Sequence, residues 1–302
     1  MEVSIDIMIP NMNGARYLKS TLESIISQSY SNYKVYLIDN ASTDESIEIF
    51  HSFEDNRFIL VEYAERVSLA ENLNRCLKNV KSDLFCIMHT DDIYFSDYLE
   101  IMSKNLIKND FALISFCNSL AIDDKGVKLS SFKYLLKRFS FDKPKSVKIL
   151  SSDEAFLKLF SYNFIVAPSV MYKKDVISKV GYFNENQMFV VDWEYYFRIL
   201  FLNRGILKIN SSHFYYRLHK SQLTYSMTKD LNKYSEMLIF KSTLIKKFYK
   251  SNFSKEFISD LKYRYKFPLY LSIIYDSLLD LFSLRFRMFK SKITFIFKIQ
   301  RF

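Results

Sequence analysis

Short apolar runs alternate with helix-like segments through the first third of the chain. The runs suited to strands are, in order, Ser4–Pro10, Tyr33–Asp39, Arg57–Tyr63 and Leu84–His89. Between them lie segments whose apolar residues recur every three or four positions, as on a helix with one buried face. These segments are Arg16–Tyr30, Asp44–Phe53 and Ser68–Val80. The alternation predicts an α/β fold built on a doubly wound, mostly parallel sheet.

Local signals sharpen two of these helices. In the first, Leu18, Leu22 and Ile25 fall on one face. Before the second, Ser42 and Glu45 form the S-x-x-E pattern of a capping box, which predicts that the helix begins there.

The pattern weakens from Ala121 to Leu150, where a turn (DDKG) and a basic loop are expected. A second region follows, and its clearest element is the helix-like stretch Val191–Asn203. From Lys229 onward the chain is again helix-like. We therefore predict a domain over residues 1–228, made of halves 1–120 and 121–228, and a helical C-terminal extension over residues 229–302.

Composition changes the interpretation mainly at the C-terminus. Of the 302 residues, 49% are hydrophobic, which supports a substantial core and argues against global disorder. The net charge of +10 lies entirely in the extension, which holds 16 basic and 6 acidic residues, whereas residues 1–228 hold 27 of each. The extension interleaves Lys and Arg with aromatic residues. This pattern fits an anionic membrane surface, a nucleic-acid binder, or a helical cap with a solvated basic face.

The cysteines and the apolar segments exclude several classes of protein. Cys76, Cys86 and Cys117 are isolated in sequence, so neither a zinc site nor a disulfide framework is expected, and a reducing cytoplasm fits. The N-terminus has no basic region followed by a long apolar run, so it is interpreted as a strand and not as a secretion signal. Every window of about 18 residues contains charge, so no membrane-spanning helix is expected.

Polar residues follow three of the predicted parallel strands. They are Asn11 and Asn13, then Asp39 and Asn40, then Asp91 and Asp92. Ligands of such sheets bind beyond the carboxyl ends of the strands. Paired carboxylates there suit Mg²⁺ or Mn²⁺, although an isolated Asp-Asp pair can also be a solvated turn or a helix cap.

Glycine-rich phosphate loops are missing from the sequence. Only Gly14 follows the first strand, so there is neither a dinucleotide-binding G-x-G-x-x-G motif nor a P-loop. A phosphate-bearing ligand would therefore need a metal ion in place of a glycine-rich loop.

The stretch IPNMNGARYLKSTLESIISQSYSNYKVYLIDNASTDES, which starts at Ile9, closely resembles the opening of family-2 glycosyltransferases of the GT-A fold. Later motifs agree in order. They are SLAENLN (68–74), HTDD (89–92) in the place of D-x-D-D, VGYFNEN (180–186), VVDWEYYFRIL (190–200) and YRLHKSQLT (216–224). The resemblance covers Ile5 to Thr224.

The resemblance implies a nucleotide-sugar site in the first half of the domain, with Asp39 accepting a hydrogen bond from a uracil or thymine N–H. The other implied nucleotide-side residues are Pro10, Asn11, Asn13, Asn74, Thr90 and Asp91. For a Mg²⁺ or Mn²⁺ ion the implied ligands are Asp91, Asp92 and His219. His89 stands where the family has the first Asp of D-x-D, and this departure weakens the expectation of strict metal dependence.

The resemblance also implies an acceptor side. Asp192 matches the family's general base, which takes the proton from the attacking hydroxyl, and Glu194 is the second choice. Trp193 is expected beside the acceptor sugar or in the core. Arg217 is expected to offer charge to phosphate. Without the resemblance, the acidic residues at 192 and 194 indicate only a favourable helix N-terminus.

These implications predict an inverting glycosyltransferase. It would move a sugar from a UDP-sugar, or alternatively a dTDP-sugar, to a glycan or lipid-linked acceptor in surface polysaccharide synthesis. The expected location is cytoplasmic, with peripheral contact at the inner face of the membrane through the extension, and no nucleic-acid partner. The alternatives are a sugar-phosphate nucleotidyltransferase, disfavoured by the single glycine in PNMNGARYL, and a non-catalytic nucleotide-sugar-binding module.

Overall fold

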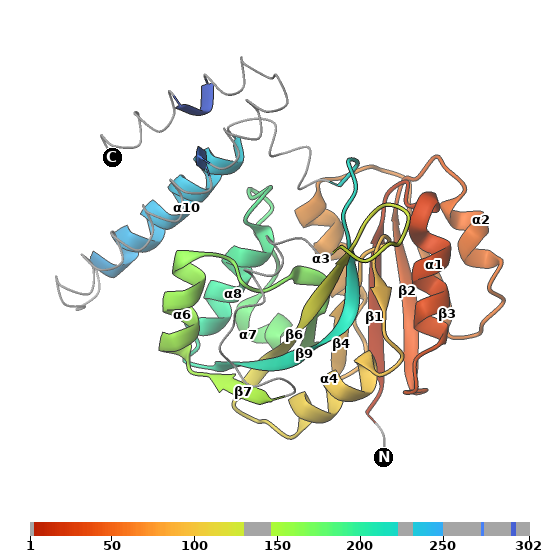
Figure 1. Cartoon of the computed structure of the whole chain (residues 1–302), viewed down its shortest axis with the longest axis horizontal. Coiled ribbons are helices and arrows are strands. Elements are labelled where there is room, and N and C mark those ends of the chain that lie inside the picture. The colour runs from red at the N-terminus through yellow and green to blue at the C-terminus, as the bar shows by residue number, and fades with distance from the viewer. Residues whose placement is uncertain (1–2, 130–145, 223–231, 250–272, 275–290, 294–302) are drawn as a thin grey trace. The chain divides into compact units, whose positions relative to one another are not determined.

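A computed structural model describes residues 3–129, 146–222, 232–249, 273–274 and 291–293 (Figure 1). The chain divides into two units. The first comprises Met1–Ala155, Ile165–Asn186 and Tyr195–Leu218, and the second comprises Phe156–Phe164, Gln187–Glu194 and His219–Phe302. Three segments of the predicted domain 1–228, namely 156–164, 187–194 and 219–228, group with the extension in this division.

The first unit begins with the predicted alternation of strands and helices. Its elements are β1 (Ile5–Asn11), α1 (Ala15–Ile26), β2 (Tyr33–Asn40), α2 (Ser46–His51), β3 (Phe58–Tyr63), α3 (Leu69–Asn79) and β4 (Leu84–Ile87). The strands are parallel and lie in the order β3-β2-β1-β4, as in a doubly wound sheet (Figure 1). The predicted α/β class with a parallel sheet is thereby confirmed.

The sheet continues beyond β4 with strands that the sequence pattern did not assign. The further elements are β5 (Ile93–Tyr94), α4 (Tyr98–Ile107), β6 (Ala112–Ile122), β7 (Val147–Leu150), α6 (Ser152–Ser161), η1 (Ala167–Ser169), β8 (Val170–Lys173), α7 (Asp175–Val180), α8 (Val191–Leu200) and β9 (Gly205–Arg217). Strand β8 lies between β4 and β6 and is antiparallel to both. Strand β9 is parallel to β6 and carries β5 and β7 as antiparallel neighbours.

The core of the first unit is apolar on the face where α1 packs against the parallel strands. Ile5, Ile7 and Ile9 of β1 are fully buried, and so are Leu18 and Leu22 of α1. Burying each such side chain contributes roughly 1.5–3 kcal/mol. This packing holds the carboxyl ends of β1, β2 and β4 at one edge.

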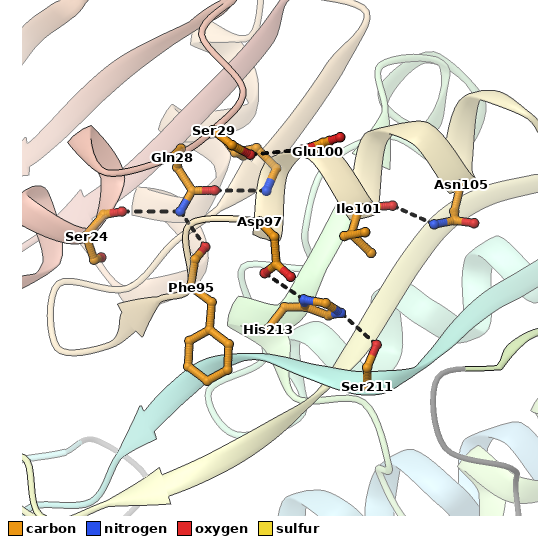
Figure 2. A network of polar contacts seen from close by, with 11 residues as sticks. Ser24, Gln28, Ser29, Phe95, Asp97, Glu100, Ile101, Asn105, Ser211 and His213 are labelled. Carbon is orange, nitrogen blue, oxygen red and sulfur yellow. Dashed lines mark hydrogen bonds and ion pairs between the residues drawn. The ribbon is translucent and has the colours of Figure 1, made fainter.

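Gln28 fastens the end of α1 to the loop between β5 and α4, as Figure 2 shows. Its side-chain Nε2 donates to the carbonyl of Phe95 at 2.7 Å, and its Oε1 accepts the main-chain N–H of Leu99 at 3.0 Å. Because Gln28 is buried, both main-chain groups would be left unpaired without it, at a cost of about 1–3 kcal/mol each.

The predicted capping box at Ser42 and Glu45 is wrong. Helix α2 begins at Ser46 without a side-chain cap, because the Ser42 hydroxyl donates to Asp39 and accepts N–H groups of Asn11 and Asn13 instead. A complete capping box occurs at α3, where Ser68 accepts the N–H of Glu71 at 3.2 Å and Glu71 accepts the N–H of Ser68 at 2.9 Å. Both sites have the S-x-x-E pattern. The serine caps the helix at Ser68, whereas at Ser42 its hydroxyl is bonded to Asp39.

The described part of the C-terminal extension contains α10 (Asn232–Tyr249). The part of the predicted helical extension after Tyr249 lies almost wholly outside the described residues, as does most of the basic loop before Val147. Among the described helices, none combines the length and the hydropathy needed to cross a membrane. All three cysteines are buried free thiols.

Candidate functional site

The carboxyl ends of β1 and β2 hold Asn11 and Asp39 side by side in the sheet register. Both are buried, and Nδ2 of Asn11 donates to Oδ1 of Asp39 at 2.7 Å. The Asp39 carboxylate also accepts the main-chain N–H of Ser42 at 2.9 Å and the Ser42 hydroxyl at 2.5 Å. These bonds hold Asp39 rigidly at the edge of the sheet, and they direct the Asn11 amide inward.

A pocket of about 500 Å³ opens beside Asp39 at the ends of β2 and β3. Its lining comprises Asp39, Ala41, Ser42, Thr43 and Ile47 from β2, the loop after it and α2, and Glu62, Tyr63 and Ala64 from β3 and the loop after it. Ala41 has φ of 54°, a left-handed conformation that alanine rarely adopts. Strained backbone of this kind tends to persist at functional sites.

Asn13 and Pro10 define the β1 side of this edge. Asn13 also has a positive φ, of 56°, and its Oδ1 accepts the main-chain N–H of Thr43 at 2.8 Å. Asn13 therefore ties the loop after β1 to the loop after β2. Pro10 is the penultimate residue of β1 and lies beside Ile38.

Gly14 links this edge to the acidic segment after β4. A Cβ atom on Gly14 would lie 2.5 Å from Oδ1 of Asn11 and 3.0 Å from the side chain of Thr90. A Cβ there would displace these side chains, so the Asn11 amide and Thr90 both lie close to the same face of Gly14. From α1, the Thr21 hydroxyl lies 2.9 Å from the carbonyl of Thr90 and 2.8 Å from that of Asp92.

His89, Asp91 and Asp92 form a cluster at the end of β4 in which one ligand atom from each lies within 4.8 Å of the others. Opposite ligands of an octahedral ion with bonds of about 2.1 Å lie about 4.2 Å apart, so the spacing suits a divalent cation after small adjustments. Oδ2 of Asp92 is buried and, among the described residues, has no hydrogen-bond partner, which is the state expected of a metal ligand.

Burial governs the ionisation of this cluster. It lowers the pKa of His89, with Asp91 opposing that shift, so the imidazole is neutral and able to bind a cation. Burial and the neighbouring Asp91 charge raise the pKa of Asp92, against which a hydrogen bond from Arg217 acts. A bound cation would favour the ionised Asp92.

Arg217 is the cation that accompanies the two carboxylates. Its main-chain N–H donates to Oδ1 of Asp92 at 3.0 Å, and its side-chain Nε donates to the carbonyl of Asp91 at 2.8 Å. The guanidinium also lies 4.6 Å from the centroid of the Tyr17 ring. Arg217 is 4% exposed and holds the acidic loop through these bonds, and the phosphate contact stays a prediction.

Asn74, whose nucleotide-side role stays a prediction, bonds the segment after α7. It is buried in α3, where its Oδ1 accepts the N–H of Phe183 at 2.7 Å and its Nδ2 donates to the carbonyl of Phe183 at 3.0 Å. Nδ2 also donates to Glu185 at 2.9 Å. The amide therefore orients the turn after α7, and so Asn74 joins the two motifs SLAENLN and VGYFNEN.

Asp192 belongs to the second unit, at the N-terminus of α8. Its Oδ2 accepts a hydrogen bond from Nδ2 of Asn163 at 3.1 Å. Burial raises the pKa of Asp192 to about 6, and the hydrogen bonds from Asn163 and from the main chain act in the opposite direction. A carboxylate with this pKa is largely ionised near neutral pH and can still accept a proton, as a general base must.

Trp193 and Glu194, predicted on the acceptor side, and His219, predicted as a metal ligand, also belong to the second unit. Trp193 is buried, donates its indole N–H to the carbonyl of Leu159 at 2.9 Å and lies against the Phe240 ring, which favours the core alternative left open for it. Glu194 lies in the first turn of α8. Nδ1 of His219 lies 2.7 Å from the Ser221 hydroxyl.

Three residues with a part in the site were not picked out from the sequence. His89 was treated as a lost carboxylate, although its place in the D-x-D-D element signalled a ligand position. Thr21 and Asn163 carried no signal, because each meets its partner only through the fold.

Comparisons with known proteins identify the family of the chain. Residues 6–181 match the family described as Glycosyl transferase family 2. An uncharacterized glycosyltransferase of Rickettsia typhi is 26% identical over 243 residues, which cover 77% of this chain and 70% of that protein.

Two solved structures share the fold at 14% sequence identity. TarS of S. aureus in complex with UDP-GlcNAc superposes with a TM-score of 0.63, over 85% of this chain and 70% of that one. The mannosyltransferase PcManGT from Pyrobaculum calidifontis, in complex with GDP-Man and Mn²⁺, gives a TM-score of 0.64 over 98% and 84%. The chain belongs to glycosyltransferase family 2 and is a glycosyltransferase with the GT-A-type fold.

Proposed function

We propose that this enzyme transfers a sugar, with inversion at the anomeric carbon, from a UDP-sugar to a glycan or lipid-linked acceptor, and that a dTDP-sugar is the alternative donor. The observation that carries the proposal is the shared strand edge of the first unit. There, the pocket beside Asp39 and the His89–Asp91–Asp92 cluster are joined through Asn11, Gly14 and Thr90.

The nucleoside of the donor would occupy the pocket beside Asp39. The two Asp39 oxygens accept bonds from Asn11 and Ser42, yet a carboxylate has about four acceptor positions. It can therefore still accept a pyrimidine N–H, as the family resemblance implies. Pro10 and Asn13 would border the nucleotide through the backbone of the loop after β1.

The diphosphate would lie at the end of β4. His89, Asp91 and Asp92 would hold Mn²⁺ or Mg²⁺, and imidazole with carboxylate suits Mn²⁺. When bound, the ion supplies positive charge against the leaving diphosphate. Arg217 fixes the loop that carries these ligands.

Asp192 would take the proton of the acceptor hydroxyl as that oxygen attacks the anomeric carbon. Its pKa of about 6 leaves it ionised at neutral pH, which this role requires. Attack opposite the leaving diphosphate inverts the anomeric centre. The proposal requires Asp192 to reach the acceptor oxygen during turnover, and surface polysaccharide synthesis is the setting that the family resemblance favours.

A binding screen followed by a transfer assay tests the proposal. In the screen, UDP-, dTDP- and GDP-sugars are tested by thermal shift with and without Mn²⁺, because a ligand specific for the native state raises the melting temperature. GDP-mannose belongs in the panel because one structural neighbour holds it. We expect a UDP- or dTDP-sugar to bind and turn over, and Asp192→Asn to lose at least about 100-fold in kcat.

The alternative outcomes are distinct. Unchanged turnover in Asp192→Asn would remove it as the base. Binding without turnover would favour a non-catalytic module, and release of pyrophosphate from a nucleoside triphosphate and a sugar phosphate would favour a nucleotidyltransferase.

Peripheral contact with the inner face of the cytoplasmic membrane is a further part of the proposal. It rests on the 16 basic residues of the extension. Removal of Tyr263–Phe302 should abolish co-sedimentation with anionic vesicles, and equal pelleting of both forms would contradict it.

A further inference from the structure

The first turn of α8, which carries Asp192, is fastened by residues outside the sequence motif that contains it. Every contact used here lies within the second unit. Three elements of that unit meet at this turn: the end of α6 with the residues after it, the segment entering α8, and α10 of the C-terminal extension.

Asn163 makes the direct contact. Its Nδ2 donates to Oδ2 of Asp192 at 3.1 Å. A hydrogen bond to one oxygen restricts rotation of the carboxylate about Cβ–Cγ, so the plane in which the acid can accept a proton is set by Asn163. A bond to a charged acceptor is also stronger than a neutral one.

Glu236 of α10 acts on the main chain that enters α8. Its carboxylate accepts the consecutive N–H groups of Met188 and Phe189 at 2.9 Å and of Val190 at 3.0 Å. Consecutive N–H groups that converge in this way form a concave anion site. Here the carboxylate of Glu236 occupies that site. Its hydrogen bonds fix the backbone up to Val190, two residues before Asp192.

Trp193 and Lys241 complete the attachment on the other side of Asp192. The Trp193 indole bonds the carbonyl of Leu159 in α6. The Lys241 ammonium of α10 lies 4.9 Å from the centroid of the Trp193 ring and 3.2 Å from the carbonyl of Ser161. The residues on both sides of Asp192 are therefore held by α6 and α10.

We propose that Asn163 and Glu236 are positioning residues for the Asp192 carboxylate, Asn163 directly and Glu236 through the backbone entering α8. The start of the C-terminal extension is then part of the catalytic apparatus. This inference rests on the proposed role of Asp192 as the general base.

The test compares Asn163→Ala, Glu236→Ala and Glu236→Gln with a control, Lys246→Ala. Lys246 is an exposed residue of α10, the helix that also carries Glu236. Each variant is assayed with the donor and acceptor identified in the transfer assay, over a range of pH. Asn163→Ala should lower kcat by about 10- to 100-fold, because a misplaced base loses alignment. It should also move the acidic limb of the kcat profile upward by about one pH unit, because the bond that favoured the charged form is gone.

Glu236→Ala should lower kcat by about 10- to 100-fold with little change in the donor KM, because only the alignment of the base is affected. Glu236→Gln should recover part of the loss, since the amide oxygen can still accept an N–H. Lys246→Ala should stay within about twofold of the wild type. If Glu236→Ala does not fold, Glu236→Gln carries the test, with a smaller loss expected. Folded Asn163→Ala and Glu236 variants with wild-type kcat and an unmoved acidic limb would overturn the inference.

A second readout needs no substrate. Trp193 is the only tryptophan of the chain, so its fluorescence reports the ionisation of groups around it. In the second unit, the charged groups besides Asp192 with described side chains on these elements are Glu194 on α8, Lys158 on α6, and Lys233, Glu236, Lys241 and Lys246 on α10. Burial lowers the pKa of Lys241 to about 7, and its step should survive in Asp192→Asn. The step from the Asp192 pKa of about 6 should vanish in Asp192→Asn and move upward in Asn163→Ala.

The two readouts separate the two claims. If the fluorescence step moves but Asp192→Asn keeps full turnover, the base assignment fails and the contact stands. If Asp192→Asn loses turnover but Asn163→Ala changes neither readout, the positioning role fails.

Discussion

The main-chain N–H of Arg217 donates a hydrogen bond to Oδ1 of Asp92 across 125 positions of sequence. The guanidinium of the same residue bonds the carbonyls of Asp91 at 2.8 Å and Asp123 at 3.3 Å. Two adjacent carboxylates are thus held at the end of β4 by one buried cation. The charge of Arg217 acts against the repulsion between them, although burial and the Asp91 charge still raise the pKa of Asp92.

Removing this cation should loosen the acidic loop. We expect Arg217→Met to lower the free energy of unfolding by about 2–4 kcal/mol, because two half-buried carbonyls lose their donor and the carboxylates lose a compensating charge. It should also weaken the stabilisation by Mn²⁺ seen in thermal shift. Arg16→Ala is the matched control, since Arg16 also lies over Tyr17 but is exposed and pairs only at the surface with Asp124. Its effect should be below about 1 kcal/mol, and equal losses in both variants would contradict the prediction.

His89 should set the metal preference. We expect His89→Ala to reduce Mn²⁺ affinity at least about tenfold, because one ligand of the cluster is removed. His89→Asp should shift the preference toward Mg²⁺, which favours oxygen ligands. Calorimetric titration of each variant with Mn²⁺ and with Mg²⁺ measures the two affinities. Identical Mn²⁺ affinities in wild type and His89→Ala would exclude His89 as a ligand.

The ionised Asp192 carboxylate should lower the free energy of unfolding at high pH. Because burial raises the pKa of Asp192 from 3.8 to about 6, the folded state favours the protonated acid. That preference stabilises the fold below about pH 4 and is lost as the pH rises to about 6. Asp192→Asn, which cannot ionise, should therefore be more stable than wild type at pH 8 by up to about 2 kcal/mol, allowing for partial exposure. The gain should shrink toward zero at pH 4. Urea unfolding at the two pH values checks this, and an equal gain at both would contradict it.

Replacing Ala41 by glycine should destabilise the fold less than the same replacement at an alanine within a helix. Its φ of 54° costs alanine about 1 kcal/mol, a cost that glycine avoids and that offsets the greater freedom of glycine in the unfolded chain. We expect Ala41→Gly to change the free energy of unfolding by less than about 0.5 kcal/mol. Ala70→Gly, inside α3, should lose about 1 kcal/mol. Denaturant unfolding of both variants decides, and a loss at Ala41 as large as that at Ala70 would argue against strain in this turn.

The parallel half of the sheet could be predicted from the sequence. Strands β1 to β4 and the helices between them came from local periodicity, because an apolar run at a sheet centre and an amphipathic helix each leave a pattern within a few residues. The strand-end positions of Asp39 and Asp91 followed from the same pattern. Strands β6 and β9 were missed, because β9 mixes polar Ser211 and Ser212 into a buried strand.

The sequence by itself determined the order of the first strands, the polar residues that end them and, through ordered motifs, the family. Only the tertiary structure decided that Asn74 bonds Phe183 and that Arg217 bonds the Asp91 loop. The physical reason is that hydrogen-bond partners more than a hundred positions apart are selected by sheet register and helix packing. Neither leaves a trace in the local order of residues.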